Sequence, residues 1–257
     1  MRQVISLLIF LAASGSSLSQ EDTAFHFARL KYDEYSPEMF YPYETYSRNW
    51  YTDYSDGTGR TMESYLMPVI ERLTTIRVAE PVVIVPEDRN IFRYPFLYTV
   101  EPEQMVLRPQ QADNLREWLN RGGFWMLDDF HGCQELEHVL RQLKRVVGPR
   151  LEFKKLTTEH PLFHTMFDIS EIVQVPVVWI GEAYAEDPTR SLDEVESDCR
   201  GPMVFLWEST NHGTILLTFN VDLGDAMEWA DYPCYPQKFP SYTYRLFTNI
   251  LIYSLSH

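Results

Sequence analysis

The sequence predicts an α/β fold in which helices cover both faces of a mostly parallel sheet. The first observation is that short apolar runs alternate along the chain with amphipathic helical stretches, as in strand-helix-strand units. The second is the turn sequence at 211–213 (NHG), which joins two apolar runs and predicts an antiparallel hairpin. The sheet is therefore expected to be doubly wound and mixed.

The predicted elements follow in order along the chain. Pro68 is expected to start or kink the first helix, whereas Pro109 suits the first turn of the second, which Gly122 and Gly123 end. Strands are predicted at residues 25–30, 81–85, 96–100, 124–127, 203–207 and 214–219, and helices at 65–73, 109–121, 136–147 and 242–253. The acidic residues 181–201 are predicted to form a solvated loop.

The N-terminus has the layout of an export signal. Arg2 precedes an apolar run at residues 4–13, and small polar residues follow at 14–19. The run is shorter than the roughly 20 residues that span a bilayer, which favours a cleaved signal over a membrane anchor. We therefore expect residues 1–19 to be removed and residues 20–257 to form a single α/β domain without a membrane span. The expected location is periplasmic or extracellular.

The charge of the chain narrows its possible partners. The formal net charge is -15 at pH 7, and no Lys/Arg cluster offsets it. Because such a chain repels phosphate backbones, we expect no nucleic-acid partner. The same charge is equally compatible with an ordinary soluble protein.

Cys133, Cys199 and Cys234 are the cysteines of the chain. In an oxidising compartment two of them can pair. Among the pairings we favour Cys199 with Cys234, because both lie in loop-like sequence. The absence of any bridge is a stronger expectation than any single pairing, since the sequence does not fix the distances in space.

Polar side chains follow several predicted strands, at the edge where open α/β sheets bind ligands. They are Asp128, Asp129 and His131 after one strand, Asn220, Asp222 and Asp225 after another, and Lys31, Tyr32, Asp33 and Glu34 after the first. If these strands are neighbours, their carboxylates converge on one rim. The functional interpretation is a site for a polar ligand or a hard cation. The structural interpretation is that Asp128 or Asp129 caps a helix and that Asp222 and Asp225 shape a turn around Gly224.

Other chemistry finds less support in the sequence. Cys133 lacks the small neighbours of a nucleophile elbow, and His160 and His164 lie in a predicted turn without a zinc signature. The aromatic segment 40–54 suits either ligand stacking or a loop packed on its own domain. The candidate ligand-binding residues are therefore Asp128, Asp129, His131, Asp222 and Asp225. We expect no metal and no cofactor.

Several stretches together resemble one known family. They are 25–32 (FHFARLKY), 122–132 (GGFWMLDDFHG), 160–163 (HPLF) and 222–229 (DLGDAMEW), with Asn49-Trp50 and Asp53-Tyr54. This set resembles the bacterial domain of unknown function 4159 family, although Met227 stands where that family more often has Trp. The resemblance implies an exported bacterial protein with a flavodoxin-like layered sheet, similar to class I glutamine amidotransferases. It implies no reaction, because the family has no established activity and the amidotransferase nucleophile elbow is not matched.

These observations lead to two functional hypotheses. The first is a non-catalytic module of the cell envelope that binds an envelope protein or a polar small ligand. The alternative is a hydrolase of an envelope carbohydrate or peptide, with Asp129 as general base and His131 as its partner. The alternative requires an enclosed pocket in which Asp128, Asp129, His131 and Asp222 come within hydrogen-bond reach.

Overall fold

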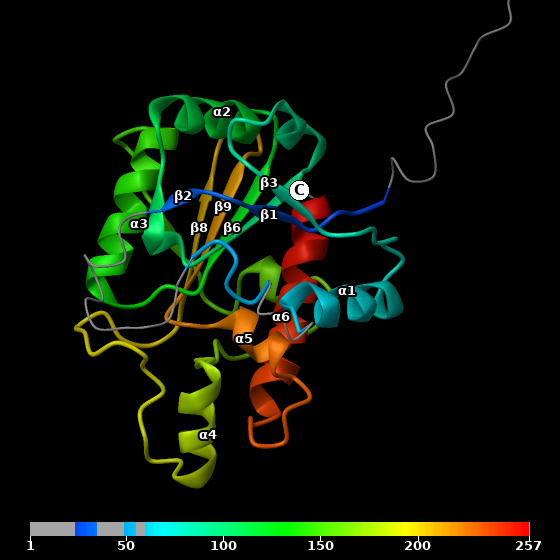
Figure 1. Cartoon of the computed structure of the whole chain (residues 1–257), viewed down its shortest axis with the longest axis vertical. Coiled ribbons are helices and arrows are strands. Elements are labelled where there is room, and N and C mark those ends of the chain that lie inside the picture. Colours follow the sequence, from blue (N-terminus) through cyan, green and yellow to red (C-terminus); the bar gives the residue numbers. More distant parts are fainter. Residues whose placement is uncertain (1–23, 35–48, 55–59, 257) are drawn as a thin grey trace, which may run out of the picture.

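The computed structural model describes residues 24–34, 49–54 and 60–256, and its centre is a mixed sheet (Figure 1). The strand order is β3-β1-β4-β6-β9-β8-β7. The strands are β1 (Ala28–Leu30), β3 (Val82–Ile84), β4 (Phe96–Val100), β6 (Phe124–Asp128), β7 (Lys154–Lys155), β8 (Met203–Glu208) and β9 (Thr214–Phe219). The pairs from β3 to β9 are parallel, whereas β8 pairs antiparallel with both β9 and β7. The predicted mostly parallel sheet and its C-terminal hairpin are confirmed.

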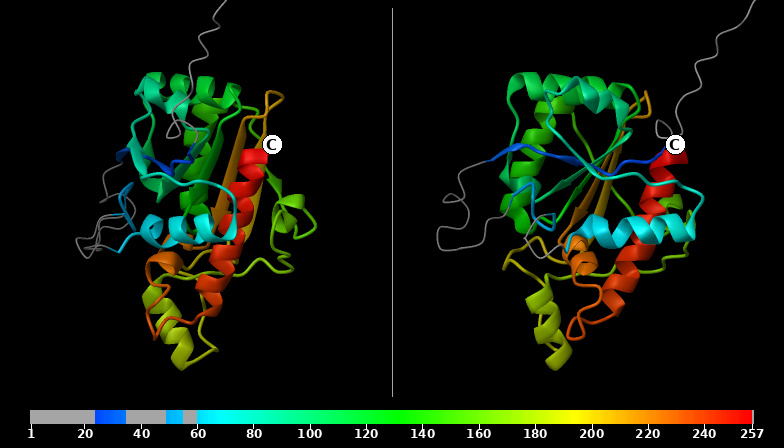
Figure 2. Two further views of the ribbon diagram at one scale, coloured as in Figure 1. Left: turned by 90° about the vertical axis from the view of Figure 1, so that its right-hand side faces the viewer. Right: turned by 45° about the vertical axis from the view of Figure 1, so that its right-hand side comes forward.

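Helices cover both faces of this sheet (Figure 2). One face packs against α1 (Met62–Leu73), α5 (Leu223–Glu228) and α6 (Lys238–Ser256), and the other against α2 (Pro109–Asn120) and α3 (Gly132–Val147). Successive side chains of a strand point to opposite faces. Tyr98 and Met126 accordingly belong to the α1/α6 core, and Leu97 and Trp125 to the α2/α3 core. The central strands are buried on both sides, which explains their continuous apolar sequences.

Smaller elements complete the structure. They are the strands β2 (Asp33–Glu34) and β5 (Met105–Val106), which pair with each other, the short helices η2 (Arg89–Arg93), η3 (Pro102–Gln104) and η4 (Pro161–His164), and the helix α4 (Val178–Glu186). The prediction of a loop at 181–201 is therefore wrong for residues 181–186, because these residues belong to α4. In Figure 1, α4 lies below the sheet.

Local signals account for the helix boundaries. Thr61 and Ser64 form a reciprocal capping box at the start of α1, and the helix continues through Pro68 rather than starting there. Pro109 occupies the first turn of α2, as predicted. After α2 the chain turns at Gly122, whose φ of +89° is one that glycine adopts without strain.

The disulfide prediction is wrong. Cys133 pairs with Cys199, with their Cα atoms 5.1 Å apart, whereas Cys234 is free and exposed. The reason lies in the packing of the loop at 187–201 against the start of α3. There the Cys133 backbone N–H donates to Ser197 Oγ over 3.0 Å, which brings Cys199 close to Cys133.

Two predicted segments fall outside the described residues. They are the export signal at 1–19 and most of the aromatic segment, of which only 49–54 is described. Across the described ranges, every helix is too short or too polar to cross a membrane.

Candidate functional site

The carboxyl ends of β6 and β9 bring acidic residues from distant parts of the sequence together. The two strands are parallel neighbours, with Asp128 opposite Thr218, so the segments that follow them leave the same edge of the sheet. Carboxylate oxygens of Asp53, Asp129 and Asp222 lie within 4.8 Å of one another, as do those of Asp53, Asp225 and Glu228. We call Asp53, Asp129, Asp222, Asp225 and Glu228 the acidic site. The predicted convergence holds for Asp129, Asp222 and Asp225.

Unusual backbone conformations direct these side chains. Asp53, Asp129 and Asn220 have φ values of 58°, 61° and 56°, in the left-handed region that Asp and Asn tolerate better than most residues. Asn220 also fastens its surroundings, because its Oδ1 accepts from the Gly132 N–H and its Nδ2 donates to the carbonyls of Cys199 and Gly201. The end of β9, the start of α3 and the disulfide are thus held in one arrangement.

The short helix α5 supplies the other side of the acidic site. Asp222 caps α5 by accepting from the Asp225 N–H over 2.7 Å. Gly224 therefore lies inside a short helix rather than in the turn that the structural interpretation predicted. Asp225 in turn accepts from the Val178 N–H over 2.6 Å, at the start of α4. Between them, Gly224 leaves room for Asp53, since a Cβ on Gly224 would lie 1.9 Å from Asp53 Oδ2. A side chain at position 224 would displace the Asp53 carboxylate.

Burial and mutual repulsion dominate the electrostatics of the acidic site. The pKa of Asp53 is raised well above its usual range, first by burial and then by the charges of Asp225 and Asp129. The pKa values of Asp222 and Asp225 are raised in the same way, with burial again the largest cause. In the protein alone, the charged form of these carboxyl groups is therefore disfavoured.

His131 and Glu194 flank the acidic site. His131 Nε2 lies 3.0 Å from Asp129 Oδ1 and 3.6 Å from Glu194 Oε2, and all of these side chains are buried. Glu194 belongs to the stretch predicted to be a solvated loop, and its burial corrects that prediction. A hollow of about 370 Å³ adjoins His131, lined also by Glu135, Ser197 and the Cys133 end of the disulfide. His131 therefore lies between the acidic site and this hollow.

Asp128 belongs to a different cluster from Asp129. The Tyr98 hydroxyl donates to Asp128 Oδ2 over 3.0 Å, and the Thr218 hydroxyl donates to Asp128 Oδ1 over 2.5 Å. Burial raises the pKa of Asp128 to about 7, an effect that these donors oppose. The capping interpretation fails for Asp128 and Asp129, because His131 is the N-cap of α3. Asp128 therefore bonds to partners within the chain and lies outside the acidic site, and its candidacy as a ligand stays a prediction.

A buried ion pair adjoins Asp128. Arg29 Nε donates to Glu63 Oε1 over 2.8 Å, and the Arg29 guanidinium lies 5.0 Å from the centre of the Tyr98 ring. Arg29 Nη1 donates to the carbonyls of Trp50 and Thr52, which fixes the segment that presents Asp53. We call Arg29, Glu63, Tyr98, Asp128 and Thr218 the paired network.

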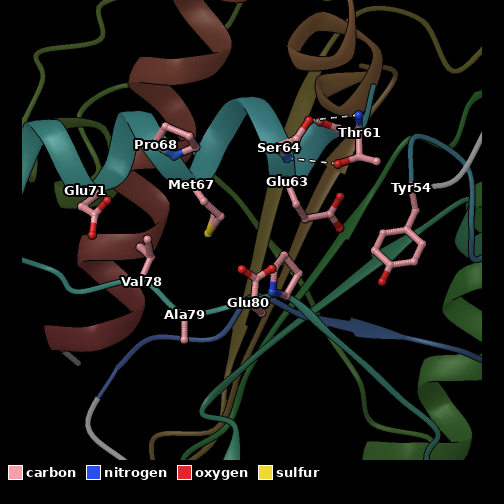
Figure 3. A pocket seen from close by; sticks show the side chains of 11 residues that line it. Tyr54, Thr61, Glu63, Ser64, Met67, Pro68, Glu71, Val78, Ala79 and Glu80 are labelled. Carbon is pink, nitrogen blue, oxygen red and sulfur yellow. Dashed lines mark hydrogen bonds between the residues drawn. The ribbon is translucent and has the colours of Figure 1, made fainter. Parts of the chain in front are cut away.

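A groove runs beside this network. It has a volume of about 550 Å³ and lies between α1 and residues 78–81. Figure 3 shows Glu63 reaching from α1 toward the segment that carries Glu80, with Tyr54 at one side. Glu71 lines the same groove, so its walls carry several negative charges.

The residues after the first strand lie apart from the acidic site. Asp33 pairs with Arg108 over 2.9 Å, and the Tyr32 hydroxyl donates to the Glu101 carbonyl over 2.8 Å. The reason is that β1 neighbours β3 and β4 rather than β6. Sequence reasoning also missed Asp53, Glu194 and Glu228. Asp53 and Glu228 lie in stretches that resemble the family, and this resemblance is the signal in the sequence that could have identified them as site residues.

The fold and the site together define an α/β protein with a buried group of carboxylates beyond the carboxyl ends of its parallel strands. The chain belongs to the family described as domain of unknown function (DUF4159), whose sequence profile matches residues 26–255. The resemblance found in the sequence is thereby confirmed. A search of curated proteins finds none that matches the chain.

Proposed function

We propose that this chain is a non-catalytic module of the bacterial cell envelope that binds a small cationic ligand in the acidic site. The observation that carries the proposal is the convergence of Asp53, Asp129 and Asp222 within 4.8 Å, in a buried position. Buried carboxylates are stable when they are paired with a cation or with hydrogen-bond donors. A ligand with positive charge supplies what the acidic site lacks.

Burial of the acidic site favours a small ligand over a protein surface. Asp129 and Asp222 are each 4% exposed, too little for direct contact with a folded partner. The groove beside α1 adds to the negative field, because Glu63, Glu71 and Glu80 line it. An envelope protein, if it binds, would contact other parts of the molecule.

Two features support export. The N-terminal residues 1–19 have the layout of a cleaved signal, and the Cys133–Cys199 bridge suits an oxidising compartment. Fractionation of cells, followed by N-terminal sequencing of the purified protein, tests this part of the proposal. We expect a mature chain that begins at Gln20 or Glu21 outside the cytoplasm. A cytoplasmic protein that begins at Met1 would contradict it.

Ligand binding is tested by melting temperatures of the purified protein in the presence of cationic and anionic probes. The cationic probes are divalent metal ions, spermidine and glucosamine, and the anionic probe is citrate. We expect at least one cationic probe to raise Tm in the wild type and in Glu137→Gln, an exposed control on α3, but not in Asp129→Asn. Stabilisation by citrate alone, or by no probe, would contradict the proposal.

A second candidate function is hydrolysis of an envelope carbohydrate or peptide, although Asp128 lies outside the group of residues that this alternative requires. The contact of 3.0 Å between Asp129 and His131 favours it, because such a pair can activate a water molecule beside the adjoining hollow. Incubation with envelope carbohydrates and peptides, with detection of new reducing ends or amines, tests it. Turnover that disappears in Asp129→Asn and His131→Asn but persists in Asp128→Asn would replace the binding proposal by this one.

A further inference from the structure

One carboxylate of the acidic site has an oxygen without a hydrogen-bond partner. Asp53 is 9% exposed, and its Oδ2 is buried without a hydrogen-bond partner among the described residues. The neighbouring acids do have protein contacts, since Asp129 Oδ1 contacts His131 and Asp222 Oδ1 accepts from the Asp225 N–H. A buried oxygen that makes no hydrogen bond is costly. One oxygen of Asp53 lies within 4.8 Å of oxygens of Asp129 and Asp222, so the Asp53 carboxylate faces the space between them.

Nearby positive charge is already engaged elsewhere. Arg29 lowers the pKa of Asp53 through its charge, but its Nε and Nη1 atoms bind Glu63 and the carbonyls of Trp50 and Thr52. Its Nη2 atom is buried without a partner among the described residues. The acidic site therefore concentrates negative charge that the described part of the chain does not balance.

We propose that Asp53, Asp129 and Asp222 bind a calcium ion. The inference rests on the proposed function, because it names the ligand of the same acidic site. Carboxylate oxygens are the ligands of hard cations. Magnesium usually keeps several waters and binds one or two carboxylates, whereas calcium accepts a larger and more flexible set of protein oxygens. The second group, Asp53 with Asp225 and Glu228, places further carboxylates next to the ion.

The groups that include Asp53 offer only carboxylate oxygens, whereas His131 belongs to a neighbouring group with Asp129 and Glu194, whose ligand atoms also lie within 4.8 Å of one another. Cys133 and Cys199, the cysteines nearest the site, are joined in a disulfide and so offer no thiolate. The His131 Nε2 atom already contacts Asp129 over 3.0 Å. The donor set around Asp53 thus consists of oxygens, which favours calcium over zinc.

A bound calcium ion would join separate segments of the chain. Asp53 comes from the segment that Arg29 fixes, Asp129 follows β6, and Asp222 begins α5 after β9. The ion would cancel the repulsion among these carboxylates and link the segments that carry them. We therefore expect calcium to stabilise the folded protein without any partner or organic ligand present.

The test is the melting temperature of the purified protein with calcium and with a chelator. For a site with the affinity typical of extracellular calcium modules, about 10 mM calcium is expected to raise Tm by about 5 °C. Asp53→Asn, which keeps the side-chain shape, should lose this rise. Asp128→Asn is the matched control: it is equally buried and next to Asp129, yet its carboxylate binds Tyr98 and Thr218. It should keep the rise even if its own Tm is lower.

Gly224→Ala provides a second variant that removes no charge. Its new Cβ would displace Asp53 Oδ2, so the calcium-induced rise should shrink as it does in Asp53→Asn. If either variant fails to fold, calorimetric titration of the wild type with calcium still decides whether the ion binds. No heat of binding and no rise in Tm would overturn the inference. An equal or larger rise with magnesium, or a rise with zinc alone, would overturn the assignment to calcium.

The same experiment separates this inference from the proposed function. In one outcome, spermidine or glucosamine stabilises the wild type but not Asp129→Asn, while calcium has no effect on either. That result would support the proposed binding of a cationic ligand and would overturn the assignment to calcium. No response to any cationic probe would overturn both.

Discussion

The paired network and the acidic site lie side by side at the carboxyl end of β6. Buried charges have partners within the chain in the paired network, whereas carboxylates lie close to one another in the acidic site. In the paired network, Arg29 binds Glu63 and Asp128 accepts from Tyr98 and Thr218. In the acidic site, Asp53, Asp129 and Asp222 face one another. The boundary falls between Asp128 and Asp129, where the left-handed backbone of Asp129 turns its side chain away from the sheet.

Buried aspartates therefore have two roles: a structural role in the paired network and a proposed ligand-binding role in the acidic site. Charges that have partners within the chain contribute to folding, and their removal should destabilise the protein. Carboxylates that face one another oppose folding until a cation binds. Substitutions in the two regions should therefore differ in sign.

The largest effect is expected in the paired network at Arg29. Arg29→Gln leaves Glu63 buried without its cation, which should lower the free energy of unfolding by about 3–5 kcal/mol. Urea denaturation measures the change. The double variant Arg29→Gln/Glu63→Gln removes both charges and should recover part of the loss. A single variant as stable as the wild type would show that the ion pair does not stabilise the fold.

The disulfide should have the next largest effect. Its cysteines are separated by 66 residues, and a bridge over such a distance restricts the unfolded chain by about 4 kcal/mol in the entropic description. Cys133→Ser/Cys199→Ser should therefore be about 2–4 kcal/mol less stable than the wild type in urea. Cys234→Ser, at the exposed free cysteine, is the control and should change little. Equal effects of the two variants would argue against the pairing.

Asp128→Asn should have an intermediate effect. The substitution replaces one acceptor oxygen by a donor group, so either Tyr98 or Thr218 loses its acceptor in a buried position. We expect a loss of about 1–3 kcal/mol in the free energy of unfolding. Tyr98→Phe removes the hydroxyl that donates to Asp128. In the double variant Asp128→Asn/Tyr98→Phe, the loss of stability should therefore be smaller than the sum of the losses in the two single variants. Strict additivity would show that the two groups do not interact.

The smallest effect is a pH dependence at His138, outside both regions. Burial of His138 in α3 lowers its pKa from 6.5, and the hydrogen bond to the Met105 carbonyl opposes this effect. Below pH 6.5 the unfolded chain takes up the proton more readily than the folded one. Stability is therefore present above this pH and is lost as the pH falls through the folded pKa. His138→Gln should flatten the dependence of Tm on pH below pH 6.5. An unchanged profile would contradict this assignment.

Much of the fold follows from the sequence because it depends on local patterns. The apolar runs at β4, β6 and β9 are continuous since both faces of these strands are buried, and the hairpin is marked by its turn. α4 was missed because its residues show little amphipathic pattern and run directly into a polar loop. The amidotransferase-like expectation stays a prediction beyond the layered sheet itself.

The site was only partly predictable because it depends on contacts across the sequence. Asp129 and Asp222 were found because they follow neighbouring parallel strands. Asp53 comes from a segment that Arg29 holds in place, a contact that no local pattern indicates. Asp128 was assigned to the site because a pattern of adjacent acids does not show which way each side chain points. The same limit explains the wrong cysteine pairing.

The most direct test of the opposition between the two regions is the stability of Asp53→Asn and Asp128→Asn, measured side by side in urea with a chelator present. Asp53→Asn removes one of several mutually repelling carboxylates, so it should be more stable than the wild type. Asp128→Asn removes an acceptor that Tyr98 and Thr218 use, so it should be less stable. Opposite signs are the expected result. A loss of stability in both variants would contradict the account, because Asp53 would then be a structural residue like Asp128.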